Sequence, residues 1–159
     1  MKEFLVTCKV QFNATYHDAS VYWNKKGTSS VLQAFLYALT CHGWHIMFLF
    51  RLSKIIYAIK IPVVSHIFKF SFQIVWFFVT TLYGIWLDLE NVIGRGFYIG
   101  HYSGIIIRGD FGDFCSVGQC VTVGTKGAGK SNGYPCFGNN VYVGAGAKVI
   151  GNIKIGSDV

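Results

Sequence analysis

Charged side chains are scarce in this sequence: Asp, Glu, Lys and Arg together make up 13% of its 159 residues. Soluble domains usually contain about 25%. Apolar residues reach 52% and aromatic residues 17%. A chain of this composition either buries much of its surface against partners or contacts lipid. Its length suits one domain, or one domain with a substantial appendage.

Acidic residues are rarest in the first half of the chain. Residues 1–87 contain two acids and eight Lys or Arg, a net charge of +6, whereas residues 88–159 contain five acids and six basic residues. The lysines of the first half are scattered among long apolar runs, which disfavours nucleic acid as a partner. Anionic lipid head groups suit this mixture better, so we expect a peripheral membrane contact.

Patterns that hold metals are absent as well. The five cysteines form no C-x-x-C pair, and no Cys/His cluster has zinc-ligand spacing, so we expect no metal. The N-terminus has no recognisable signal peptide. We therefore expect a reducing cytoplasmic setting, with the basic half at the inner face of the membrane.

Long apolar runs dominate residues 30–87 and predict helices, the second of which opens at Pro62. Residues 67–87 are long enough to cross a bilayer, but they include Lys69 and Gln73. The composition favours a helix that packs in an oligomer or lies on a membrane surface.

A six-residue period begins at Ile93, and glycine directly follows eight of its ten apolar positions. Such a repeat is typical of a parallel β-helix, in which three hexads close one triangular coil. We expect an α+β chain, with a helical region over residues 1–87 and a β-helix domain over residues 88–159. The ten positions are Ile93, Ile99, Ile105, Phe111, Val117, Val123, Phe137, Val143, Val149 and Ile155.

One stretch, GTKGAGKS at residues 124–131, fits the phosphate-loop pattern G-x-x-x-x-G-K-[ST]. In a true phosphate loop the Lys-Ser pair begins a helix. Here Asn, Gly, Tyr and Pro follow, and they oppose a helix. The hexad register instead predicts a loop over residues 125–136 that leaves the coil and returns, which disfavours an ATPase.

Three segments carry a resemblance to a known family: IGRGFYIGHYSGIII, VTVGTKGAGKSNGYP and VYVGAGAKVIGNIKIG. Over residues 84–159 the chain resembles the serine acetyltransferase-like branch of the hexapeptide-repeat acyltransferases. The resemblance implies a left-handed β-helix, a homotrimer with active sites between neighbouring chains, acetyl-CoA as acyl donor and a hydroxyl acceptor. Because that family continues for at least one more coil, the three coils counted from Ile93 suggest a C-terminal truncation.

The resemblance places the family's catalytic histidine at His101, as a general base without a covalent acyl-enzyme. An imidazole with a pKa near 6.5 can accept a hydroxyl proton, and backbone amides of the coil can stabilise an oxyanion. The family's orienting carboxylate falls at Trp86, and Asp88 is a candidate replacement or an ordinary polar residue. The helical half holds the remaining histidines: His17, His42, His45 and His66.

The resemblance also assigns a CoA channel to Thr125, Lys126, Gly144, Ala145 and Gly146. Small residues there let the pantetheine arm pass close to the backbone. The alternative is that coil corners need small residues in any case.

The acceptor is predicted from the positions at which this sequence differs from the family pattern. The resemblance expects an Asp at Gly100 and an Arg-His pair at Gly133 and Tyr134, which argues against L-serine. A similar GYP loop occurs in relatives associated with polysaccharide synthesis. We therefore predict O-acetylation of a sugar hydroxyl in bacterial surface polysaccharide synthesis, with Tyr134 at the acceptor. Two alternatives stay open: a serine O-acetyltransferase of cysteine biosynthesis, and a truncated, non-catalytic trimer scaffold.

Overall fold

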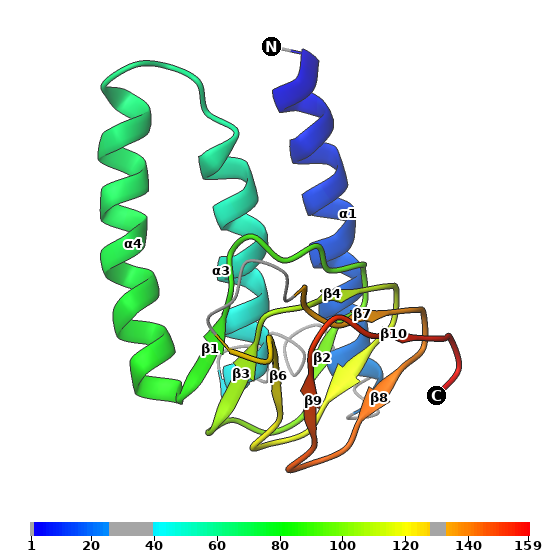
Figure 1. The fold of residues 1–159 in the computed structure, drawn as a ribbon. Coiled ribbons are helices and arrows are strands. Elements are labelled where there is room, and N and C mark those ends of the chain that lie inside the picture. The colour runs from blue at the N-terminus through cyan, green and yellow to red at the C-terminus, as the bar shows by residue number, and fades with distance from the viewer. Residues whose placement is uncertain (1, 26–39, 128–132) are drawn as a thin grey trace.

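The computed structural model describes residues 2–25, 40–127 and 133–159. Its long helices stand side by side next to a three-sided stack of short parallel strands (Figure 1). The helices are α1 (Lys2–Lys25), α3 (His42–Tyr57) and α4 (Val64–Tyr83). Helix α4 starts just after Pro62, as predicted, and ends at Gly84 in the left-handed conformation. Within the described ranges, no helix combines the length and apolarity that crossing a bilayer requires.

The strands form three parallel sheets, which the chain visits in turn. Their orders are β1-β3-β6-β9, β4-β7-β10 and β2-β5-β8. This arrangement confirms the predicted helical region followed by parallel strands. The strands are β1 (Ile85–Leu87), β2 (Tyr98–Ile99), β3 (Ile105–Ile107), β4 (Asp110–Phe111), β5 (Ser116–Val117), β6 (Thr122–Gly124), β7 (Cys136–Phe137), β8 (Tyr142–Val143), β9 (Lys148–Ile150) and β10 (Lys154–Ile155).

The hexad positions form the core of the coil. Eight of the ten are at most 7% exposed, and Val149 and Ile155 in the last turn are half-buried. Phe111 and Phe137 stack with ring centroids 4.2 Å apart, one turn above the other. The coil starts at Ile85, ahead of residue 88, where the sequence placed the boundary.

The sequence predicts an excursion over residues 125–136; in the structure β6 ends at Gly124 and β7 already begins at Cys136. The described residues 125–127 and 133–135 leave and rejoin the stack there, and Asp110 N donates to Pro135 O at 3.1 Å. Residues 128–132, which include Lys130 of the phosphate-loop match, lie outside the described residues.

Side chains of helix α1 accept hydrogen bonds from the backbone amides at the open edge of β2. The amides of Tyr98 and Gly100 bond to the next strand, so those of Phe97 and Ile99 point away from the sheet. Phe97 N donates to Asp18 Oδ1 and Ile99 N to the Tyr22 hydroxyl, each at 2.9 Å. Asp18 and Tyr22 are four residues apart, on one helix face. Two side chains thus replace the missing neighbouring strand.

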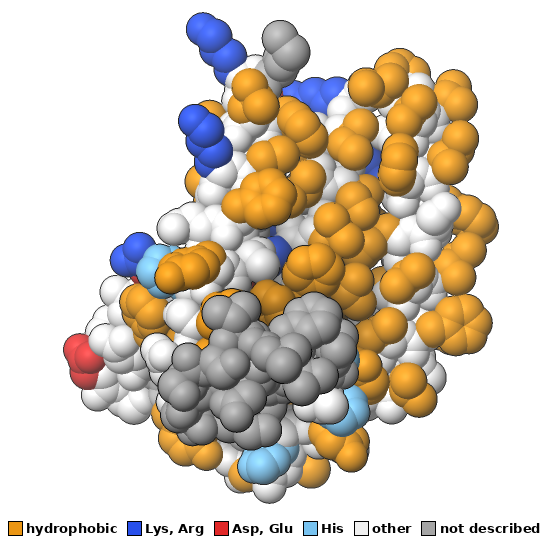
Figure 2. All heavy atoms as spheres, turned by 180° about the vertical axis from the view of Figure 1, so that it is seen from behind, with side chains coloured by type: hydrophobic (Ala, Val, Ile, Leu, Met, Phe, Trp, Pro, Cys, Tyr) orange, Lys and Arg blue, Asp and Glu red, His pale blue; other side chains and the backbone are white. Residues whose placement is uncertain are grey.

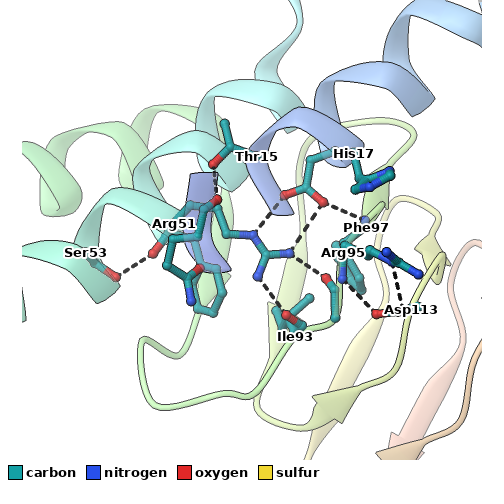
Figure 3. Close-up of polar contacts among 12 residues, drawn as sticks. Thr15, His17, Arg51, Ser53, Ile93, Arg95, Phe97 and Asp113 are labelled. Carbon is teal, nitrogen blue, oxygen red and sulfur yellow. Dashed lines mark hydrogen bonds and ion pairs between the residues drawn. The ribbon is translucent and has the colours of Figure 1, made fainter. Parts of the chain in front are cut away.

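Helix α3 supplies the matching donors. Arg51 pairs with Asp18 at 2.9 Å and donates to the carbonyls of Ile93, at 2.7 Å, and Gly94 (Figure 3). Lys54 Nζ donates to two further carbonyls of the same turn, those of residues 89 and 91. Burial raises the pKa of the Asp18 carboxyl, against the opposing effects of Arg51 and the Phe97 amide. The pair is therefore costly to bury, and its contribution is to fix helices and coil in one geometry.

Removal of the buried guanidinium is expected to destabilise the whole fold. Arg51→Met leaves a buried carboxylate and two carbonyls without their donor, a loss of about 3–5 kcal/mol in the free energy of unfolding. Arg95→Met removes the exposed Arg95–Asp113 pair and costs less than about 1 kcal/mol. Urea denaturation followed by circular dichroism measures both; equal losses would contradict the structural role of Arg51.

Candidate functional site

Three glycine-rich turns stack where the chain passes from the third sheet to the first. They are residues 100–104, 118–120 and 144–146, which we call the His101 edge. Backbone bonds join each turn to the next: Cys120 N donates to Ser103 O at 3.2 Å, and Gly146 N donates to Gln119 O at 2.8 Å. The structure thus brings His101 and the predicted CoA residues 144–146 to one edge.

His101 lies two residues after β2, on an exposed turn. Ser103 and Gly104 both have positive φ, 87° and 68°, and they bend the chain back into β3. A Cβ at Gly104 would lie 3.2 Å from Cys120 Sγ, so the turn rests closely on the one below. Among the described residues the imidazole has no hydrogen-bonding partner, which leaves it accessible to an acceptor.

The glycines of the His101 edge are not equivalent. At Gly118 a Cβ would lie 2.7 Å from the backbone N of Ala145, and Gly146 has a φ of +77°, so packing or conformation explains both. Gly144 has an ordinary φ, and no atom of the described residues lies within 4 Å of the position that a Cβ would take there. Coil geometry therefore does not require glycine at 144, and open space lies beside it.

The other predicted site residues lie at the opposite end of the first sheet, at what we call the Asp88 edge: residues 88, 108, 124–126 and 134. Asp88 follows β1, pairs with Arg108 at 3.3 Å and accepts a bond from Glu90 N at 3.0 Å. The strands between the two edges are three residues long, which spans about 10 Å. Within one chain the structure does not bring Asp88 to His101.

The loop residues complete the Asp88 edge. Lys126 is exposed, and its aliphatic chain lies along Gly151, while Thr125 Oγ1 donates to Gly127 O at 3.4 Å. Tyr134 is exposed close to Asp110, whose charge raises the pKa of the phenol. These side chains form a polar margin on the far side of the sheet from His101.

A cluster that the sequence did not assign borders the His101 turn. His42 stacks on Tyr102 with ring centroids 4.1 Å apart and meets the Tyr83 ring edge-on at 4.6 Å. His45 Nδ1 lies 2.8 Å from the Tyr83 hydroxyl. The available signal was the three-residue spacing of His42 and His45, which puts both imidazoles on one helix face.

Curated relatives share sequence with most of the described fold. Serine acetyltransferase of Synechococcus elongatus is 34% identical over 124 residues, which cover 77% of this chain and 45% of the relative. The Helicobacter pylori serine acetyltransferase is 42% identical over 78 residues, 48% of this chain and 46% of that protein. The chain therefore spans about half the length of the curated relatives it matches. No model of a known protein family matches it.

Solved structures extend the likeness to the helices. Serine acetyltransferase isoform 3 of Entamoeba histolytica, in complex with cysteine, aligns with a TM-score of 0.71 at 28% identity and covers 98% of this chain and 53% of its own. Another serine acetyltransferase complex with cysteine gives a TM-score of 0.74 at 18% identity and shows the fold alone.

These comparisons correct the predicted acceptor class. The sugar O-acetyltransferase of polysaccharide synthesis is wrong, because the similar proteins are serine acetyltransferases. The prediction rested on three loop and turn positions, Gly100, Gly133 and Tyr134, which weigh little against similarity over 124 residues. In sequence and in fold, the chain is serine acetyltransferase-like.

Proposed function

We propose that this chain acts as a serine O-acetyltransferase, which transfers the acetyl group of acetyl-CoA to the hydroxyl of L-serine. The observation that carries the proposal is the 34% identity over 124 residues to a serine acetyltransferase. Its support in the fold is an exposed histidine, His101, on a stacked glycine-rich edge. The left-handed winding of the coil is part of the same proposal.

His101 serves in this proposal as general base. Its imidazole takes the proton of the serine hydroxyl while the oxygen attacks the thioester carbonyl. Backbone N–H groups of the turn are candidates to stabilise the tetrahedral oxyanion. Collapse of the intermediate breaks the C–S bond, CoA leaves as a thiolate that takes up the proton, and O-acetylserine remains. No covalent acyl-enzyme forms.

The open space beside Gly144 supports a path for the acyl donor, acetyl-CoA. We propose that the pantetheine arm passes over Gly144 to Gly146 on the His101 edge. The exposed ammonium of Lys126, with Thr125 beside it, is the candidate partner for the phosphates at the Asp88 edge. No metal takes part in this scheme.

The acceptor site lacks partners that the family resemblance leads one to expect. Gly100 provides no carboxylate for the serine ammonium, and Gly133 and Tyr134 provide no Arg-His pair for its carboxylate. Tyr134 lies at the Asp88 edge, so its proposed acceptor role requires a neighbouring chain or a movement of the loop. We expect serine to bind weakly in consequence.

Helix α4 carries an exposed apolar surface. Large hydrophobic side chains line its outer face, where orange atoms dominate Figure 2. Lys69 is the one charged residue of α4. We propose that copies of the chain bury this face in a homotrimer. The exposed large hydrophobic residues of α4 are Val64, Ile67, Phe68, Phe70, Ile74, Val75, Phe77, Phe78 and Leu82.

The acceptor and the base are tested together. With acetyl-CoA and L-serine, wild-type protein is expected to release CoA, measured by thiol titration, and to form O-acetylserine, identified by mass spectrometry. His101→Gln is expected to lower kcat by about 100- to 10,000-fold, because it removes the proton acceptor while keeping a polar side chain.

Three results would overturn parts of this assignment. Full activity of His101→Gln would contradict the assignment of His101 as general base. Turnover with UDP-sugars and none with serine would contradict the assignment of L-serine as the acceptor. Failure to turn over any hydroxyl acceptor, in a protein that is folded and trimeric, would favour the scaffold.

The donor's path is tested at Gly144. Gly144→Val fills the open space and is expected to raise the KM for acetyl-CoA by about tenfold, equivalent to about 1.4 kcal/mol of binding. Gly156→Val is the matched control, because in the part of the chain that the structure describes no atom lies within 4 Å of its Cβ position either, and this glycine lies after β10. Equal KM values for the two variants would place the donor elsewhere.

The oligomer is tested at the outer face of α4. Light scattering on a sizing column is expected to give a trimer for the wild type and a monomer for Phe70→Asp/Phe77→Asp, since both side chains exceed 60% exposure. A monomeric wild type would contradict the trimer. If that monomer floated with phosphatidylserine vesicles, the outer face of α4 would be a membrane-binding surface instead.

A further inference from the structure

The turn that carries His101 lies against the ends of two helices. Ser103 N donates to Tyr83 O and Ile105 N to Gly84 O, each at 3.1 Å. Gly84 has a φ of +61°, and a Cβ there would lie 3.3 Å from Ser103 Cα. The C-terminal end of α4 therefore contacts the backbone of the turn directly.

Helix α3 contacts the same turn through a ring. The imidazole of His42 stacks on Tyr102, the residue after His101, with an interplanar angle of 33°. Tyr102 is 53% exposed, and among the described residues its ring contact is with His42. Fixing the Tyr102 ring restricts the backbone between it and His101.

Tyr83 joins the two contacts. Its ring meets His42 edge-on with an interplanar angle of 85°, and its hydroxyl is bonded to His45 Nδ1 at 2.8 Å. Tyr83 therefore bonds to the turn through its backbone carbonyl, contacts His42 through its ring and bonds to His45 through its hydroxyl. The rings of His45, Tyr83, His42 and Tyr102 form a continuous chain from α3 to the residue beside His101.

We propose that His42, held by Tyr83 and His45, is a positioning residue that fixes the orientation of His101 by stacking on Tyr102. This inference rests on the proposed function for its catalytic consequence, but its structural part does not. It also accounts for a feature of the site: with Asp88 bonded to Arg108 at the far edge, the described residues of one chain offer His101 no orienting carboxylate. The aromatic support restrains the turn by packing instead.

The test compares two substitutions at one position. His42→Ala removes the ring, whereas His42→Phe keeps a flat ring of similar size that can stack on Tyr102. With serine and acetyl-CoA, His42→Ala is expected to lower kcat about 10- to 100-fold through misplacement of the base, with the KM for acetyl-CoA unchanged. His42→Phe is expected to retain most of kcat.

Amide hydrogen exchange of Ser103 supplies a readout independent of activity. Exchange is expected to speed up at least about tenfold in His42→Ala, and to stay near the wild-type rate in His42→Phe. Unchanged exchange in His42→Ala would overturn the positioning role whatever the substrate. Faster exchange with an unchanged kcat would overturn its link to catalysis. If the wild type does not use serine, the proposed function fails, and the exchange rates still decide the positioning role.

Discussion

The free backbone edge of the first coil turn is the constraint on which the rest of the structure depends. A parallel coil must begin somewhere, and its first turn has no earlier strand to accept its amides or donate to its carbonyls. Here Asp18 and Tyr22 of α1 accept hydrogen bonds from the outward amides just before and within β2, while Arg51 and Lys54 of α3 donate to carbonyls of the same turn. Each such group left unpaired and buried would cost about 1–3 kcal/mol.

These four side chains, which we call the edge cap, also determine where the candidate catalytic residue His101 lies. Strand β2 ends two residues before His101, so the side chains that hold β2 fix one end of the turn that carries the base. The other end enters β3, which pairs with β1 directly after α4. Helices and coil therefore form one packed unit around the His101 edge. The length of the strands in the first sheet separates the CoA-binding residues proposed on the two edges.

The sequence predicted the coil well because its signal is periodic and local. Ten apolar positions at a spacing of six put a side chain inward at every turn, and all ten are buried or half-buried. The edge cap could not be predicted, because Asp18 and Phe97 are 79 residues apart and no repeat relates them. The same holds for the contact of His42 with Tyr102. The acceptor was predicted wrongly, because Gly100 and Tyr134 carry little information without the surrounding fold.

Amide hydrogen exchange at Phe97 and Ile99, measured by NMR in the wild-type chain, tests the edge cap most directly. These two amides point away from the sheet, so among the described residues Asp18 and Tyr22 are the groups that protect them. The cap predicts protection close to that of the Val117 region in the middle of the coil. Exchange at the rate of an exposed loop would show that the helices do not cap the coil, and the placement of His101 would lose its basis.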